Sequence, residues 1–196
     1  MSWYHIGAFY FPASWVAIVF AVSVTGVYLH FTQSKEVRDL YSNLLFTIFL
    51  TWKLSVLLFD FTTSIHHPFT IVYFHGGVKG FILGVLFSLF YLWNRPNQRV
   101  FLQAWVILIV VYEGAFLCFN QELTPALLLL NVVNLLFLAW FWKSGRNTVS
   151  EIPLLCLFTL FQGTLYSVRG ELLSAPMLIY AIMLIFFTIQ QRKGSR

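Results

Sequence analysis

Apolar residues gather along this chain into seven long runs that are separated by short polar segments. The runs cover residues 8–31, 41–60, 72–93, 100–119, 124–143, 152–168 and 172–190. A helix of about 20 apolar residues crosses the hydrocarbon core of a bilayer, and most of these runs reach or approach that length. The pattern therefore predicts an all-α integral membrane protein with seven transmembrane helices.

The composition supports the same class and leaves no segment polar enough for a soluble domain. Of the 196 residues, 59% are hydrophobic and only 10% are charged, so we expect a single membrane domain over residues 1–196. The net charge of +5 does not indicate nucleic-acid binding, because the basic residues are scattered and lie mostly in loops. No basic segment precedes the first run, which we therefore expect to be a retained span rather than a signal peptide.

The distribution of lysine and arginine predicts the orientation. If all seven runs span the membrane, nine basic residues fall on one side: Lys35, Arg38, Arg95, Arg99, Lys143, Arg146, Arg192, Lys193 and Arg196. Only Arg169 falls in a loop on the other side. Loops rich in lysine and arginine stay in the cytoplasm. We therefore expect an outside N-terminus and a cytoplasmic C-terminus.

The third run opens with a glycine stripe beside two polar side chains. Its glycines recur at positions 76, 80 and 84, on one face of a helix, where another helix could approach closely. His75 and Lys79 lie four residues apart on a neighbouring face. An ammonium group within the hydrocarbon costs about 2.5–3.5 kcal/mol on insertion scales, so Lys79 calls for a partner or for access to the surface.

Polar side chains occur at a common depth in the outward half of the predicted bundle. Lys53, Lys79 and Glu113 each lie about six or seven residues from the outer end of a run, or about 10 Å deep at 1.5 Å per residue. Residues at a comparable depth in other runs are Ser14, Asn131 and Gln162. Two interpretations are open: an ion pair such as Lys53–Glu113 with amide contacts between helices, or a polar pocket that admits a lipid headgroup from the outer leaflet.

No metal or cofactor is expected. His66, His67 and His75 could ligate zinc, but neither a cysteine nor a spaced carboxylate completes a recognisable site. Cys118 and Cys156 fall at opposite membrane faces, which argues against a disulfide between them.

Several segments match one family of bacterial membrane enzymes in the same order. They are residues 52–59, His67-Pro68, residues 73–80 (YFHGGVKG), 119–123 (FNQEL) and 170–179 (GELLSAPMLI), with a looser match over residues 6–15. Together they resemble prolipoprotein diacylglyceryl transferase. That family has seven spans with the N-terminus outside, and transfers diacylglycerol from phosphatidylglycerol to the cysteine thiol of a lipoprotein precursor. The resemblance implies an anionic phospholipid and possibly a lipoprotein precursor as partners, in the bacterial plasma membrane.

The resemblance also implies roles for individual residues. His75 would orient a substrate or relay a proton, as the pKa of histidine permits. Lys53 and Lys79 would hold the lipid phosphate, and Glu113 would either balance them or act as a base. The other residues that we assign to the headgroup site are Asn120, Glu122, Asn131, Gln162 and Arg169.

The chain also departs from that family's pattern, and the departures predict weak or no transferase activity. Lys53 stands at a family arginine, residues 113–115 replace a second arginine, and Tyr166 stands near the place of a third. Only about four residues join the fourth and fifth runs, where the family carries a large insertion. The alternatives are a non-enzymatic protein that binds lipid or a partner, and a small transporter. The transporter is disfavoured because the inward half lacks polar residues.

Overall fold

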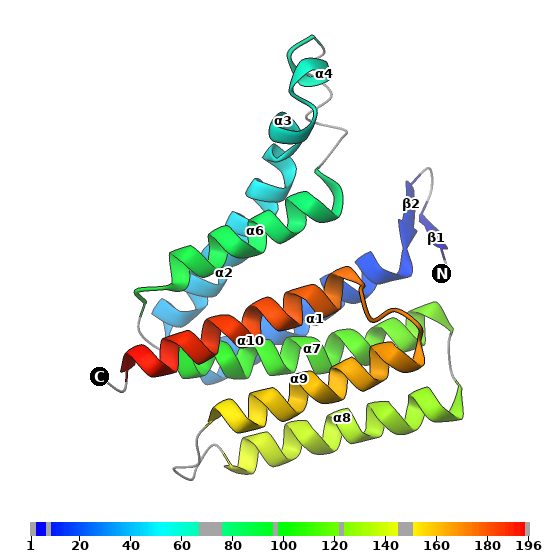
Figure 1. Cartoon of the computed structure of the whole chain (residues 1–196), viewed down its shortest axis with the longest axis vertical. Helices are drawn as coiled ribbons and strands as arrows, with labels where there is room; N and C mark the ends of the chain where they lie inside the picture. Colours follow the sequence, from blue (N-terminus) through cyan, green and yellow to red (C-terminus); the bar gives the residue numbers. More distant parts are fainter. Residues whose placement is uncertain are drawn as a thin grey trace. The chain divides into compact units, whose positions relative to one another are not determined.

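The computed structural model describes residues 3–6, 9–66, 76–95, 98–121, 124–144 and 151–194. These residues are almost all helical (Figure 1). The helices are α1 (Ala13–Thr32), α2 (Lys35–Leu54), α3 (Val56–Phe59), α4 (Phe61–His66), α6 (Gly77–Leu92), α7 (Gln98–Asn120), α8 (Pro125–Ser144), α9 (Glu151–Val168) and α10 (Ala175–Gly194). The expected all-α class is confirmed.

Three helical stretches are long and apolar enough to cross a membrane, which supports the expected membrane protein. They are Ala13–Thr32, Lys35–Phe59 and Arg99–Asn120. Four other apolar helices, α6, α8, α9 and α10, contain shorter stretches of this kind. Each of the seven predicted runs thus contains one main helix. The count of seven spans and their orientation stay predictions.

The N-terminal segment differs from the sequence-based expectation. The first run was expected to be helical from residue 8, but a β-hairpin of β1 (Trp3–Ile6) and β2 (Phe9–Pro12) precedes α1. Both strands are rich in aromatic residues, which favour extended structure. Pro12 has an extended backbone (φ −68°, ψ 148°) at the N-cap of α1, so the helix begins only at Ala13.

Local chemistry explains other helix starts. The α8 helix begins at Pro125, whose missing N–H is not needed in a first turn. The Leu127 N–H donates to the Thr124 hydroxyl at 3.4 Å, so Thr124 caps the helix. The α2 helix begins at Lys35, ahead of its apolar run, with Glu36 in the first turn, where the helix dipole favours an acidic side chain.

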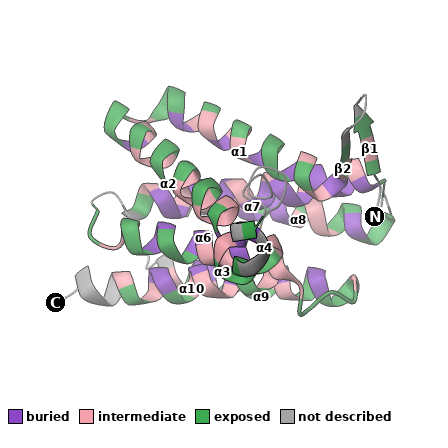
Figure 2. Ribbon diagram, turned by 90° about the horizontal axis from the view of Figure 1, so that it is seen from above, coloured by how far each residue is buried: buried purple, intermediate pink, exposed green. Residues whose placement is uncertain are grey.

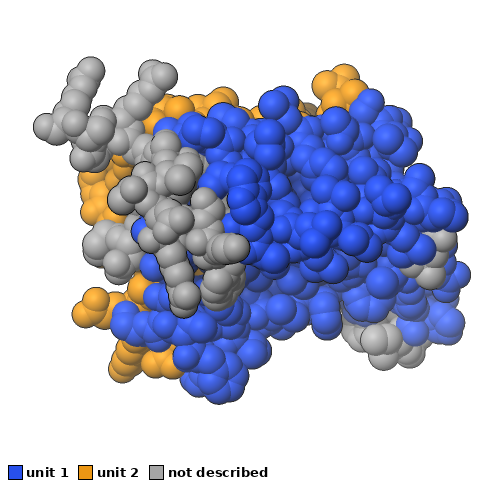
Figure 3. Space-filling model, turned by 90° about the horizontal axis from the view of Figure 1, so that it is seen from below, with its two compact units in different colours: residues 1–34, 97–170 blue, residues 35–96, 171–196 orange. Residues whose placement is uncertain are grey.

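The chain divides into two compact units (Figure 3). The first comprises residues 1–34 and 97–170, and the second comprises residues 35–96 and 171–196. Each unit therefore combines two separate stretches of the sequence. Whether the two units form the single membrane domain that the sequence predicts stays a prediction.

In the first unit, α7 is the helix around which the others pack. It contacts both α1 and α8, and α8 contacts α9. In the most apolar stretch of α7, 61% of the residues are buried, compared with 22% in that of α1. Buried positions recur along the length of α7 (Figure 2). The α1 face against it consists of fully buried small residues at Ala13, Ala17 and Ala21. Small side chains at this spacing let two helices approach closely, as is typical of helix packing in lipid.

In the second unit, the glycine stripe lies against α2, as its spacing predicted. A Cβ at Gly84 would come within 2.8 Å of the Ile48 carbonyl oxygen, and one at Gly80 would overlap the Ser55 side chain. The Trp52 indole N–H donates to the Gly77 carbonyl at 3.0 Å, which ties α2 to the start of α6. This unit also includes α10, which contacts α6.

Candidate functional site

A buried ionic cluster lies at the centre of the first unit. Glu113, on α7, is fully buried. One of its carboxylate oxygens accepts a hydrogen bond from the Tyr166 hydroxyl at 2.8 Å, and the other accepts one from Arg169 Nη1 at 2.9 Å. Both oxygens of the carboxylate are therefore engaged. We call Glu113, Tyr166 and Arg169 the ionic cluster.

The end of α9 positions the arginine of this cluster. Arg169 directly follows the last helical residue, Val168, and Gly170 then adopts a left-handed backbone (φ +72°) that lets the chain turn away. A cation at a helix C-terminus is stabilised by the helix dipole. The guanidinium also lies over two rings, with its carbon 5.3 Å from the centre of Phe116 and 5.5 Å from that of Tyr166. Its side chain is only 5% exposed.

The guanidinium of Arg169 retains unused hydrogen-bonding capacity. Its Nε and Nη2 atoms are both buried, and neither has a hydrogen-bond partner among the described residues. These two N–H groups point to the same side of the planar group and form a fork that matches two oxygens of a carboxylate or phosphate. Buried donors are normally satisfied, so this edge is suited to a ligand group with two acceptor oxygens.

A second polar contact joins α8 to α9. The Gln162 side-chain N–H donates to the Asn134 carbonyl oxygen at 2.8 Å, and both residues are fully buried. Asn134 Nδ2 and Gln162 Oε1 have no partner among the described residues. Asn131, one turn earlier on α8, lies beside Gly114, where a Cβ would be 3.5 Å from its side-chain nitrogen.

The first unit thus contains two buried polar contacts, and they include three of the proposed site residues and two residues that the sequence did not single out for this role. Glu113, Gln162 and Arg169 all contribute buried polar groups to the first unit, and Asn131 is half-buried nearby. Asn134 was missed, and Tyr166 was noted only for its place in the resemblance. The spacing of Gln162, Tyr166 and Arg169 on one face of α9 was the available signal.

The remaining proposed residues belong to the second unit, to the end of α7 or to segments outside the described residues. Lys53 is half-buried near the end of α2 and Lys79 is exposed near the start of α6, both in the second unit. Asn120 is buried where α7 ends. His75 and Glu122 lie outside the described residues. The expected approach of Glu113 to a lysine stays a prediction, and Arg169 is the cationic partner observed.

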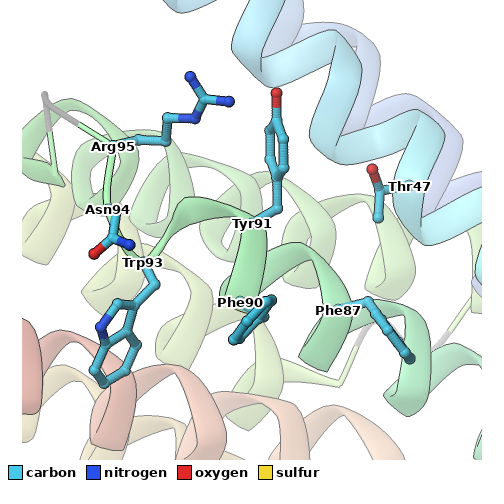
Figure 4. Close-up of a pocket in the computed structure, with 7 residues that line it drawn as sticks. All are labelled: Thr47, Phe87, Phe90, Tyr91, Trp93, Asn94 and Arg95. Atoms are coloured by element: carbon cyan, nitrogen blue, oxygen red, sulfur yellow. The ribbon is translucent and has the colours of Figure 1, made fainter.

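None of these residues lines the cavity shown in Figure 4. It has a volume of about 610 Å³ and belongs entirely to the second unit, on α2, α6 and the segment that follows α6. Four of its seven lining residues are aromatic, and Arg95 stacks over the Tyr91 ring at 4.7 Å. Aromatic and arginine side chains are common at the edge of a membrane. The buried cluster, rather than this open groove, is the better candidate site.

The described part of the chain contains neither a candidate metal group nor a disulfide. No three histidine, cysteine or acidic side chains gather there in a group that could hold a metal ion. Cys118 and Cys156 are both free thiols, in agreement with the expectation that they do not form a disulfide.

Comparison with family models, with curated proteins and with solved structures finds no significant match to this chain.

Proposed function

We propose that this chain is a bacterial plasma-membrane protein that binds the headgroup of an anionic phospholipid and carries out little or no diacylglyceryl transfer. The observation that carries the proposal is the Nε–Nη2 edge of Arg169, which has no hydrogen-bond partner among the residues that the structure describes. Phosphatidylglycerol fits this edge, because its phosphodiester presents two acceptor oxygens. The headgroup would lie near the outer leaflet if the chain is oriented as its basic loops predict.

The rest of the cluster explains why this edge is available. Because the Tyr166 hydroxyl satisfies one oxygen of Glu113, the carboxylate needs only one nitrogen of Arg169. Glu113 thus holds the guanidinium in place and leaves its other edge unused. Lys53 and Lys79, the other cations of the predicted headgroup site, belong to the second unit.

Weak or absent transfer is supported by the same contacts. A carboxylate that already accepts hydrogen bonds on both oxygens is poorly prepared to remove a proton from a thiol. Only residues 121–124 join α7 to α8, so no large insertion is present to position a lipoprotein peptide. Misplacement of a substrate by itself can cost about 100-fold in rate.

Lipid binding can be tested on the purified full chain in detergent. Phosphatidylglycerol should raise the thermal stability more than phosphatidylcholine, and native mass spectrometry should show the bound lipid. Arg169→Lys retains the charge but loses the planar fork, so both effects should weaken. Arg99→Lys is the matched control, because it makes the same replacement at an exposed arginine at the other end of α7. Equal effects of the two lipids on the wild-type chain would contradict the proposal.

Transfer is tested separately with phosphatidylglycerol and a peptide that carries a lipobox cysteine. We expect the cysteine to stay unmodified. Turnover that disappears in His75→Ala would show that the chain is an active transferase and would overturn the second half of the proposal.

A further inference from the structure

The N-terminal hairpin has one exposed face and one face that packs on the protein. In its register Trp3 pairs with Pro12 and His5 with Tyr10, and directly opposed residues share a face. Trp3 is 64% exposed and Tyr10 is 71% exposed, and His5 beside them is also exposed. We call these three side chains the aromatic face.

The opposite face attaches the hairpin to the end of α7. The Tyr4 hydroxyl donates to the Phe119 carbonyl at 2.6 Å, and the rings of Tyr4 and Phe119 meet edge to face at 6.2 Å. Phe11, which pairs with Tyr4 in the register, is half-buried. The hairpin is therefore held in one orientation on the first unit, with its aromatic face turned outward.

The hairpin is also directly continuous with a helix that can span a membrane. β2 ends at Pro12 and α1 begins at Ala13, so no linker separates them. The outward side chains of α1 continue the apolar surface, with Val19 66% and Phe20 49% exposed. A strand of four residues measures about 13 Å, so the aromatic face lies within that distance of the start of the span.

The chemistry of this segment fits a lipid interface better than water. Residues 1–34 contain no lysine, arginine, aspartate or glutamate, whereas hairpins in water commonly protect their edges with charged side chains. Tryptophan and tyrosine combine an apolar ring with one polar group, which favours the headgroup zone of a bilayer. We propose that the aromatic face of the hairpin inserts into the lipid headgroup zone and fixes the depth at which α1 begins.

A depth measurement in vesicles of phosphatidylcholine tests this inference. An environment-sensitive fluorophore is attached at Tyr10→Cys, which keeps Trp3, in a chain that also carries Cys118→Ser and Cys156→Ser. The comparison sites are Val19→Cys, on the exposed side of α1, and Ser34→Cys, in the exposed connection after α1. Quenchers are placed on the lipid headgroup, deep in the acyl chain, or in the aqueous phase as iodide.

We expect the label at position 10 to be quenched most strongly from the headgroup, whereas the label at position 19 is quenched most strongly from the acyl chain. The emission of the label at position 10 should lie at shorter wavelength than the emission of the label at position 34. Iodide quenching as strong as at position 34 would show that the face is in water. Protection from every quencher would show that protein covers it. Either result would overturn the inference.

A companion variant separates insertion from attachment. Tyr4→Phe removes the hydrogen bond to Phe119 but keeps the aromatic face, so quenching from the headgroup should persist. Because the aromatic face carries no lysine or arginine, insertion does not require anionic lipid. Failure of this test is therefore distinct from failure of anionic-lipid binding at Arg169.

Discussion

At the scale of single residues, the ionic cluster joins α7 to the end of α9. Glu113 is fully buried, and removing its partner would leave a charge in a setting of low dielectric constant. A buried ion pair often contributes little compared with apolar side chains of similar volume, yet breaking it is costly. The loss of stability should therefore be larger when one partner of the pair is replaced than when both are replaced.

Glu113→Leu alone should destabilise the protein by about 3–5 kcal/mol, because it leaves Arg169 buried without its carboxylate. Glu113→Leu combined with Arg169→Leu should lose less stability than the single change. Thermal unfolding in detergent measures both variants, with Arg99→Gln as the control for loss of a charge. A double variant less stable than Glu113→Leu would show that the pair does not behave as a coupled unit.

Much of this cluster could not be found from the sequence, and the reason is geometric. Depth along a helix follows from counting residues, and Glu113 and Gln162, which were placed at a common depth, are both buried. The rotation of each helix about its axis does not follow from counting. Arg169 was assigned to a loop and to a headgroup, but the turn at Gly170 and the ring of Phe116 bring it back against Glu113.

At the scale of helices and strands, hydropathy located the helices well and missed the hairpin. Each apolar run contains a helix because the runs are long and few breakers interrupt them. An aromatic strand and the start of an apolar helix have similar hydropathy. Hydropathy therefore does not reveal the boundary between β2 and α1 at Pro12. The close approach of another helix to the glycine stripe was predicted correctly, because the spacing of small residues along one helix is visible in the sequence.

The contact of α6 with α2 predicts different effects of the same substitution at two helical glycines. Gly84→Ala should lower the stability by about 1–3 kcal/mol, because the new methyl group would meet the Ile48 backbone at 2.8 Å. Gly114→Ala is the matched control, since its Cβ would make only an ordinary contact with Asn131 at 3.5 Å.

Alanine is favoured over glycine within a helix by about 0.5–1 kcal/mol, so the control should be neutral or slightly stabilising. Apparent melting temperatures in detergent distinguish the two variants. Equal effects would mean that α6 and α2 are not held at the observed distance.

At the scale of the whole molecule, the nine-to-one distribution of loop charges predicts the topology. Reporter fusions after Lys35, Asn97 and Gly145 should give cytoplasmic signals, and fusions after Thr63 and Glu122 should give external ones. Three helical stretches are long enough to span a membrane. The fusions therefore test above all whether the four shorter apolar helices also span it. An external signal from any of the first three fusions would contradict the seven-span arrangement.

The division of the first unit between two stretches of sequence has a consequence for how the protein is made. The fully buried alanines of α1 pack against α7, yet about 65 residues separate the end of one helix from the start of the other. At about 5–20 residues per second, a ribosome needs about 3–13 s to synthesise that interval. During this time α1 has entered the membrane without its partner, and its small-residue surface is open to any other helix. We therefore expect α1 to depend on a membrane chaperone or insertase until α7 has been made.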